Sequence, residues 1–260
     1  EPRYVLPNRV YGKGTGFEQH EFFEAPSIRK KGEYYYLIYS SVVMHELCYS
    51  VSKNPLEGFT YGGVIISNCD IGISNGKPKE KPMAYGANNH GGIVNIRDQW
   101  YIFYHRHTNH SWYCRQGCAE PITFQGEHIR QVEMTSCGLN GKPLKGKGTY
   151  PSYIACNLFT EKEEMYVGGE NQPYIMRDGC DGDYDPAYIT NLTDHATAGF
   201  KYFSCKDVKK IGISVRGYAR GEFEVRTAWD GSVCGKISVD FTNVWEYYEA
   251  PVKIDNGIQA

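Results

Sequence analysis

Short runs of alternating apolar and polar residues dominate the chain, and no segment keeps apolar residues at helical spacing for three turns. The runs are rich in Tyr, Val, Ile and Phe and lie between clusters of Gly, Asn, Asp and Pro, which is typical of strands joined by turns. We therefore expect an all-β protein. In the first half, the pattern predicts strands over residues 22–29, 34–41, 46–52, 61–66, 91–97, 100–106, 112–116, 120–124 and 128–134.

Two units of similar layout follow one another in this half. The first runs from Phe22 to Ile66 and the second from Gly91 to Met134. Each begins with an inner strand, a turn and an aromatic strand (Y-Y-Y-L-I-Y-S or Q-W-Y-I-F-Y-H), and each continues with further strands. Four-stranded units that recur every several tens of residues are typical of a β-propeller, so we expect residues 1–137 to contain propeller blades.

A change of composition at residues 138–149 indicates a domain boundary. The segment G-L-N-G-K-P-L-K-G-K-G-T lacks apolar periodicity and predicts a linker. Residues 150–260 return to short alternating strands, predicted over Lys209–Val215, Gly221–Ala228 and Gly235–Phe241. This pattern predicts a β-sandwich, and the sandwich looks incomplete because a new strand begins near Ile258.

Charge and composition exclude several classes of partner. The 28 Lys and Arg residues nearly balance 30 Asp and Glu residues, and no run of like charge stands out. Neither nucleic acid nor a membrane surface is therefore expected to bind, and no apolar stretch reaches the roughly 18 residues of a membrane span. The 22 Tyr and 4 Trp residues suit surfaces that stack on sugar rings, although Tyr also fills ordinary strands.

The nine cysteines are an odd number, are scattered and form no C-x-x-C pair. They favour reduced, buried thiols over a disulfide framework or a zinc site, and hence a reducing, cytoplasmic compartment. Secretion stays open, because the chain begins at Glu1 without an initiator Met and its N-terminus looks processed or truncated.

Glu24 is the residue of the first unit that most needs an explanation. It lies between Phe22-Phe23 and Ala25-Pro26 in a predicted strand. If the strand is buried, desolvation raises the pKa of the carboxyl group and makes it a proton donor. Glu24 is then either reserved for acid chemistry or paired with a cation in the core.

With these motifs in view, residues 1–137 resemble the C-terminal blades of the five-bladed propeller of glycoside hydrolase family 43. The segment E-A-P-S-I-R-K-K-G-E-Y-Y-Y-L-I-Y-S resembles the one that carries the general acid, which implies that role for Glu24. N-H-G-G-I-V resembles the start of the next blade, where a histidine faces the channel near calcium or its water shell, which implies His90. R-Q-G-C-A-E-P-I-T-F is similar to the strand whose arginine reaches the sugar, which implies Arg115.

Residues 150–260 resemble, more weakly, a carbohydrate-binding module of family 6, which implies a jelly-roll β-sandwich. The segments A-G-F-K-Y-F-S-C-K-D-V-K-K-I-G-I-S-V and G-E-F-E-V-R match its central strands, whereas Y-I-A-C-N-L-F-T replaces the usual acidic opening segment. A calcium ion in this domain is therefore only a weak implication. Trp229, beside Asp230-Gly231 in a predicted turn, is a candidate sugar platform.

The family resemblance implies an inverting, exo-acting hydrolase that removes α-L-arabinofuranosyl or β-D-xylosyl units from plant polysaccharides or oligosaccharides. It also implies two catalytic aspartates in earlier blades, which must come from further sequence or from a second polypeptide. Asp70 and Asp98 lie in predicted turns and do not replace them. The alternative is a non-catalytic carbohydrate-binding protein, or an inactive fragment that lacks the general base.

Two further positions carry alternatives. Arg115 could form a bidentate contact with a sugar hydroxyl or with Glu24, or instead pair with Glu120. In the run His105-Arg106-His107, two histidines share a strand face, as metal ligands do. No carboxylate or cysteine nearby completes a ligand set, so we expect satisfied or solvated histidines at a strand end.

Overall fold

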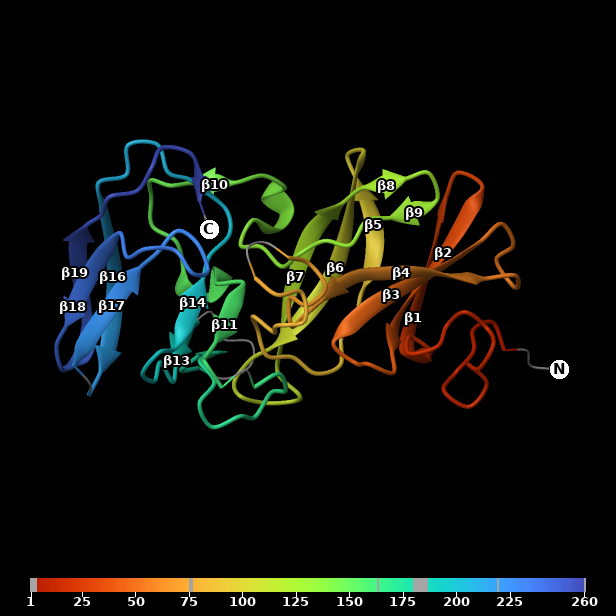
Figure 1. The fold of residues 1–260 in the computed structure, drawn as a ribbon, viewed down its shortest axis with the longest axis horizontal. Coiled ribbons are helices and arrows are strands. Elements are labelled where there is room, and N and C mark those ends of the chain that lie inside the picture. Colours follow the sequence, from red (N-terminus) through yellow and green to blue (C-terminus); the bar gives the residue numbers. More distant parts are fainter. Residues whose placement is uncertain (1–3, 75–76, 163, 180–186, 219, 260) are drawn as a thin grey trace.

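The computed structural model describes residues 4–259 except residues 75–76, 163, 180–186 and 219. Its described part contains strands and only two short 3-10 helices, η1 (Gly138–Asn140) and η2 (Ser152–Ile154), so the expected all-β class is confirmed. Figure 1 shows small sheets arranged in a row, with β1–β4 towards one end and β16–β19 at the other.

The first sheet follows the sequence prediction closely. Its strands are antiparallel and lie in chain order: β1 (Phe22–Lys31), β2 (Tyr34–Ser41), β3 (Glu46–Ser52) and β4 (Thr60–Ser67). The second sheet has the order β5 (Gly92–Ile96), β6 (Gln99–His107) and β7 (Arg115–Ile122). A hairpin of β8 (Phe124–Gln125) and β9 (His128–Ile129) follows it.

The second unit departs from its prediction at two places. The strand expected over 128–134 is wrong beyond Ile129, because only the two residues of β9 are a strand there. The strands expected over 112–116 and 120–124 are wrong, because residues 115–122 form the single strand β7 along the edge of β6. The strand tolerates Pro121 because β7 lies at the edge of the sheet, where the missing N–H removes no interior hydrogen bond. The segment 108–114 is the turn between β6 and β7.

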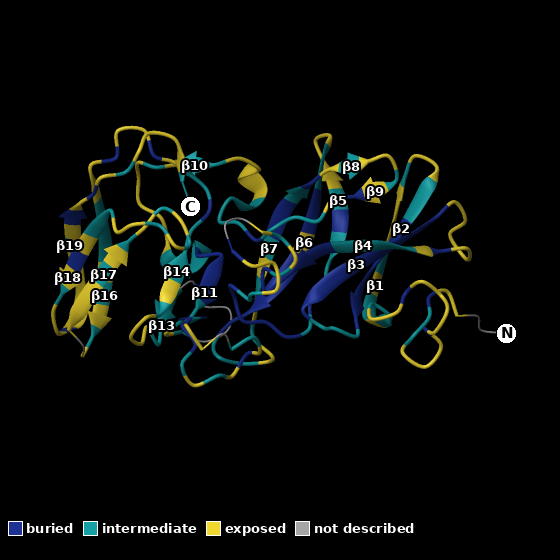
Figure 2. Cartoon of the chain, in the orientation of Figure 1, coloured by how far each residue is buried: buried dark blue, intermediate teal, exposed yellow. Residues whose placement is uncertain are grey.

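The first sheet is buried on both faces. Successive side chains of β2 point to opposite faces of the sheet, and each set packs into a different hydrophobic cluster. Tyr36 and Ile38 belong to a cluster shared with the second sheet, in which Ile93 and Ile102 are also fully buried. Leu37 and Tyr39 face the other way and pack with Leu6 and Phe17 of the N-terminal segment. Figure 2 shows the resulting burial along β2, β3 and β6.

The second half consists of short sheets. Two antiparallel pairs, β16 with β19 and β17 with β18, form the end of the row in Figure 1. The strands predicted there are present, and a long strand that we did not predict, β19, follows them. The bounds are β10 (Leu144–Lys145), β11 (Asn157–Phe159), β12 (Tyr174–Met176), β13 (Tyr188–Thr190), β14 (Thr197–Gly199), β15 (Phe203–Ser204), β16 (Lys210–Gly217), β17 (Gly221–Val225), β18 (Gly235–Val239), β19 (Thr242–Pro251) and β20 (Ile258–Gln259).

The predicted linker, residues 138–149, contains η1 and β10, and β10 pairs with β15, which in turn pairs with β20. A hydrophobic cluster crosses this region of the sequence, since Tyr85 and Ala87 pack with Leu158 and Ile175. Residues that follow the predicted linker therefore share a core with residues that precede it. The three-part domain division stays a prediction.

A buried ion-pair network joins the two halves at Lys201. Its Nζ atom lies 2.9 Å from Oδ2 of Asp70 and 2.8 Å from Oε2 of Glu133. Although burial opposes the charge of Lys201, these two carboxylates raise the pKa of its ammonium group. Asp70 does occupy a turn, as expected, with φ of 57°, but its carboxylate is buried and also accepts from Asn157.

Two remaining observations concern the chain as a whole. The eight cysteines among the described residues are free, and Cys180 lies outside those residues. In the described part of the chain, no helix is long and apolar enough to cross a membrane.

We predict that Lys201→Ala lowers the free energy of unfolding by about 3–5 kcal/mol, because it leaves the buried Asp70 carboxylate without its cation. Urea denaturation measures the change. Lys210→Ala is the matched control, since Lys210 pairs with Glu249 at the surface and its loss costs little. Equal effects of the two substitutions would contradict the prediction.

Candidate functional site

A β-bulge positions Glu24 at the start of β1. The register of β1 on β2 shifts between Glu24 and Ser27, so that Ala25 and Pro26 together stand opposite a single residue of β2. Ala25 adopts a φ of 57°, a left-handed conformation that is uncommon outside glycine. Bulges bend a strand and redirect its side chains, and this bulge directs the Glu24 carboxylate towards the second sheet.

The loop before β5 carries the partners of this carboxylate. Nε2 of His90 lies 2.7 Å from Oε1 of Glu24, and Nδ2 of Asn88 donates to the same oxygen at 3.2 Å. Gly91 holds this loop against β6, because a Cβ atom there would lie 1.9 Å from the carbonyl oxygen of Phe103. The sequence N-N-H-G-G thus supplies two hydrogen-bonding side chains and a backbone compact enough to bring them to Glu24.

Arg115, the first residue of β7, reaches the same group indirectly. Its Nη2 atom donates to Oδ1 of Asn88 at 3.3 Å rather than to Glu24. The alternative pairing with Glu120 is wrong: residues five apart on a strand point to opposite faces, so Arg115 is exposed while Glu120 is buried. The Glu120 carboxylate accepts from Thr135 instead, and burial raises its pKa to about 8.

Asn88 is the residue of this site that the sequence analysis missed. Its amide nitrogen bonds Glu24 and lies 3.3 Å from His90, while its amide oxygen accepts from Arg115 and lies 3.2 Å from Nε2 of His107. It therefore connects the carboxylate to the guanidinium without adding charge. The only sequence signal was its place two residues before His90.

The expected buried, protonated state of Glu24 is wrong for this structure. Its side chain is 37% exposed, and the rise in pKa that desolvation causes is outweighed by the groups that lower it. The hydrogen bond from His90 is the largest cause that lowers its pKa, and Asn88 and the Arg115 charge lower it further. Glu24 is consequently ionised at neutral pH in this chain, and a proton donor role needs an additional influence on it.

The histidines of β6 lie beside this group and are buried rather than solvated. His105 stands edge-on to His90 with ring centroids 5.3 Å apart, and His107 contacts His105 in the same way. Burial lowers the pKa of His105 to about 3 and that of His107 to about 4, so both rings are neutral. Both ring nitrogens of His105 and Nδ1 of His107 have no hydrogen-bond partner among the described residues, contrary to our expectation of satisfied histidines.

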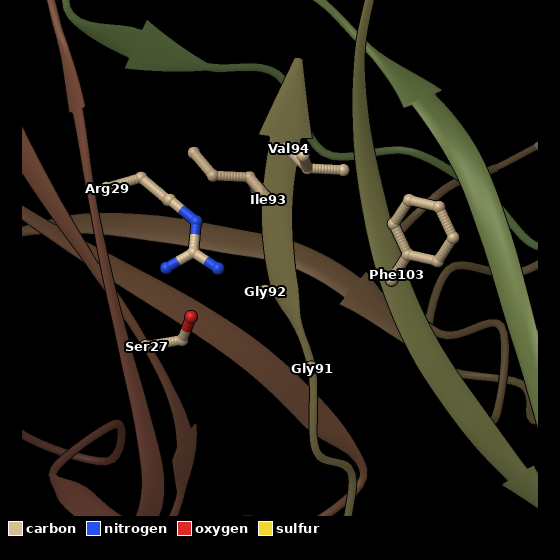
Figure 3. Close-up of a pocket in the computed structure, with 7 residues that line it drawn as sticks. All are labelled: Ser27, Arg29, Gly91, Gly92, Ile93, Val94 and Phe103. Atoms are coloured by element: carbon tan, nitrogen blue, oxygen red, sulfur yellow. The ribbon is translucent and has the colours of Figure 1, made fainter. Parts of the chain in front are cut away.

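A hollow of about 330 Å³ lies between β1 and β5, and Gly91, the neighbour of His90, is among its lining residues. Figure 3 shows the Arg29 guanidinium and the Ser27 hydroxyl directed into the space between the two strands. Gly92 keeps this space open, because a Cβ atom there would lie 2.6 Å from Oγ of Ser27. The remaining lining residues are Gly91, Ile93, Val94 and Phe103.

The residues around His90 do not by themselves form a calcium site. Calcium takes six to eight oxygen ligands. Among the described side chains that bond the His90 group, only Glu24 and Asn88 offer oxygens, and the amide oxygen of Asn88 already accepts from Arg115. A water-mediated calcium contact of His90 stays a prediction.

Trp229 does not join the group around Glu24. It lies in the turn between β17 and β18, with its ring centroid 4.9 Å from that of Phe159 and Nζ of Lys81 4.6 Å from its ring. An exposed tryptophan does lie beside the site: Trp112 contacts His107 and is 42% exposed. Trp112, which lies three residues before Arg115, was not singled out in the sequence analysis.

The chain is similar in sequence to known proteins with names of glycoside-hydrolysing enzymes. The chain is 58% identical, along its whole length, to a xylosidase/arabinosidase from Thermoclostridium stercorarium, of which it spans 56%. It is 30% identical, over 96% of its length, to an arabinoxylan arabinofuranohydrolase from Paenibacillus polymyxa, of which it spans 40%. The chain thus spans about half the length, or less, of these relatives.

Solved structures resemble the chain only distantly. A family 43 arabinoxylan arabinofuranohydrolase from Bacillus subtilis, solved with cellotetraose, is 17% identical; the match covers 92% of this chain and 49% of that one, with a TM-score of 0.43. A family 43 enzyme from Xanthomonas citri, solved with xylose, is 28% identical; the match covers 44% of this chain and 30% of that one, with a TM-score of 0.35.

No protein-family model matches the chain. The identity with the xylosidase/arabinosidase nevertheless extends over every part of the sequence. This common descent supports the resemblance to glycoside hydrolase family 43 that the motifs around Glu24, His90 and Arg115 carry.

Proposed function

We propose that this chain supplies the general-acid side of an inverting, exo-acting glycoside hydrolase. The enzyme removes α-L-arabinofuranosyl or β-D-xylosyl residues from plant polysaccharides or oligosaccharides. The observation that carries the proposal is the joining of Glu24, His90 and Arg115 into one hydrogen-bonded group through Asn88. The relatives named for xylosidase, arabinosidase and arabinofuranohydrolase activities support the substrate class.

We further propose that the sheets β1–β4 and β5–β7 are neighbouring blades of a five-bladed propeller, and that residues 150–260 include a jelly-roll β-sandwich. In support, β1 and β5 each begin a meandering antiparallel sheet and lie on either side of the hollow in Figure 3. These two strands would then line the central channel. The remaining blades would come from the rest of the protein or from a second polypeptide.

In the proposed reaction, Glu24 protonates the glycosidic oxygen as the bond to the anomeric carbon breaks. A second carboxylate, roughly 6.5–9.5 Å from Glu24, activates the attacking water on the opposite face of the sugar. Such a negative group close to Glu24 would raise the pKa of Glu24, because like charges disfavour ionisation. It would counteract the lowering by His90 and prepare Glu24 as an acid.

The other residues of the group bind and orient. Arg115 is exposed and offers donors to sugar hydroxyls, while Asn88 fixes it relative to Glu24. The exposed face of Trp112 suits stacking on the apolar face of a sugar ring.

A non-catalytic carbohydrate-binding protein is the competing function, because the described residues near Glu24 include no second carboxylate in its hydrogen-bonded group. Aspartates on the inner strands of the other blades favour the enzyme, and their absence favours the binding protein.

We predict that Glu24→Gln, in the longest native form of the protein, lowers kcat/KM on xylosides or arabinofuranosides with poor leaving groups by about 10²–10⁴-fold. Aryl substrates with good leaving groups need less protonation and should lose much less. Steady-state assays on both substrate types measure this difference. Glu33→Gln, at an exposed surface pair, is the matched control. Undiminished activity on the poor leaving group would rule out Glu24 as the acid.

We predict that the Glu24 carboxyl of the 260-residue chain titrates below its ordinary value of 4.5, and that His90→Ala raises its pKa. The reason is that His90 is the largest stabiliser of the ionised form. Carboxyl NMR over an acid titration measures both values. In a longer, active form of the protein, His90→Ala should move the alkaline limb of the pH–activity profile to higher pH, because a general acid works only while it is protonated. An unchanged Glu24 pKa would contradict the role of His90.

We predict that Asn88→Ala lowers kcat/KM by about 10²-fold, because both Glu24 and Arg115 lose the contact that fixes their relative position. The same substitution should raise the Glu24 pKa, a readout that a general loss of stability does not produce. Asn95→Ala, which removes only a turn contact to Asp98, is the control. A loss of activity with an unchanged Glu24 pKa would contradict positioning through Asn88.

A further inference from the structure

A second group of side chains, outside the Glu24 site, brings together an imidazole, a carboxylate and a thiol. His20 lies just before β1, and Glu46 and Cys48 lie on one face of β3. One ligand atom of each residue lies within 4.8 Å of the other two. Nδ1 of His20 is 2.6 Å from Oε1 of Glu46, and Sγ of Cys48 is 3.3 Å from that oxygen.

The burial of these residues is unusual for their chemistry. Glu46 is 4% exposed and Cys48 is completely buried, whereas 30% of the His20 side chain remains exposed. Figure 2 shows that β3 is buried along its length. A buried carboxylate needs compensating partners, and here they converge on a single carboxylate oxygen that accepts from His20, Ser41 and Cys48.

The separations are close to those of a tetrahedral zinc site. Zinc–ligand bonds of about 2.0 Å to nitrogen and oxygen and 2.3 Å to sulfur place neighbouring ligand atoms roughly 3.2–3.8 Å apart. The Glu46–Cys48 separation already falls in this range, and the His20–Glu46 separation needs an increase of well under about 1 Å. His20 is the one of the three ligands with substantial exposed surface, so a fourth ligand from solvent would enter on its side.

Neighbouring residues hold the three ligands in place. The ring of Tyr61 stacks on that of His20 with centroids 5.0 Å apart and an angle of 10°, and its hydroxyl lies 3.9 Å from Sγ of Cys48. The hydroxyl of Ser41 donates to Glu46. Partners of this kind orient metal ligands in known sites.

We propose that His20, Glu46 and Cys48 bind a thiophilic divalent cation, with zinc as the physiological class and water as the fourth ligand. On binding, the thiol proton of Cys48 leaves to solvent and Sγ bonds the metal as a thiolate. The thiolate and the carboxylate then neutralise the dication. Sulfur and nitrogen ligands favour zinc over calcium or magnesium, which distinguishes this site from the calcium contact expected at His90.

The site has a structural consequence for the first sheet. It ties His20, which lies four residues before Glu24 in the sequence, to β3. The ligands come from two separate segments and include one cysteine, so no local motif such as C-x-x-C marks the site in the sequence.

Cobalt(II) is the probe that tests this proposal. The chelator-treated 260-residue chain should bind one equivalent and develop intense visible bands of tetrahedral cobalt together with a near-ultraviolet thiolate charge-transfer band, and zinc should displace both. Cys48→Ser should lose the charge-transfer band. Cys205→Ser, at a buried thiol in a different cluster, should keep it.

A substitution beside the ligands, rather than of a ligand, tests the site in a second way. Ser41→Ala removes the hydroxyl that donates to Glu46 and accepts from the Val43 N–H, and should weaken zinc binding by about 10–100-fold. A folded wild-type chain that develops no charge-transfer band would overturn the proposal, as would a band that persists in Cys48→Ser. These readouts do not depend on hydrolase activity, so the proposed function can fail while the metal site stands.

Discussion

The position of the Glu24 carboxylate depends on the hydrophobic contact between the two N-terminal sheets. Tyr36, Ile38, Ile93 and Ile102 fill this contact, and their burial brings the start of β1 to the loop before β5. The hydrogen bond between Glu24 and His90 joins residues 66 positions apart, and neither strand could fix it alone. Because packed cores resist small displacements, this contact gives a polar site a defined geometry.

The electrostatics of the site follow from which groups are buried. His105 and His107 lose their charge through burial, so they border Glu24 without adding positive charge. Arg115 remains exposed and charged, and the amide of Asn88 joins it to the carboxylate. The balance favours an ionised Glu24, and either a further negative group nearby or loss of water around the carboxyl would raise its pKa.

Two buried cations hold the C-terminal half against the first. Lys201 pairs with Asp70 and Glu133, and Arg106 donates to the carbonyl oxygens of Tyr153 and Ala155. Buried pairs of this kind add little net stability compared with apolar contacts, but breaking one leaves an uncompensated charge. They therefore favour one arrangement of the segments over alternatives. The hydrophobic cluster around Tyr85 and Leu158 contributes the non-directional part of the same contact.

The sequence by itself determined the strand class, the four strands of the first sheet and the presence of Glu24, His90 and Arg115 at ends of strands or in a loop. These features are local, since side-chain alternation and turn residues act over a few positions. Only the tertiary structure decided that Glu24 is half-exposed and ionised, that Asn88 connects it to Arg115 and that Asp70 pairs with Lys201. Burial and pKa depend on residues distant in the sequence, so no local pattern could specify them.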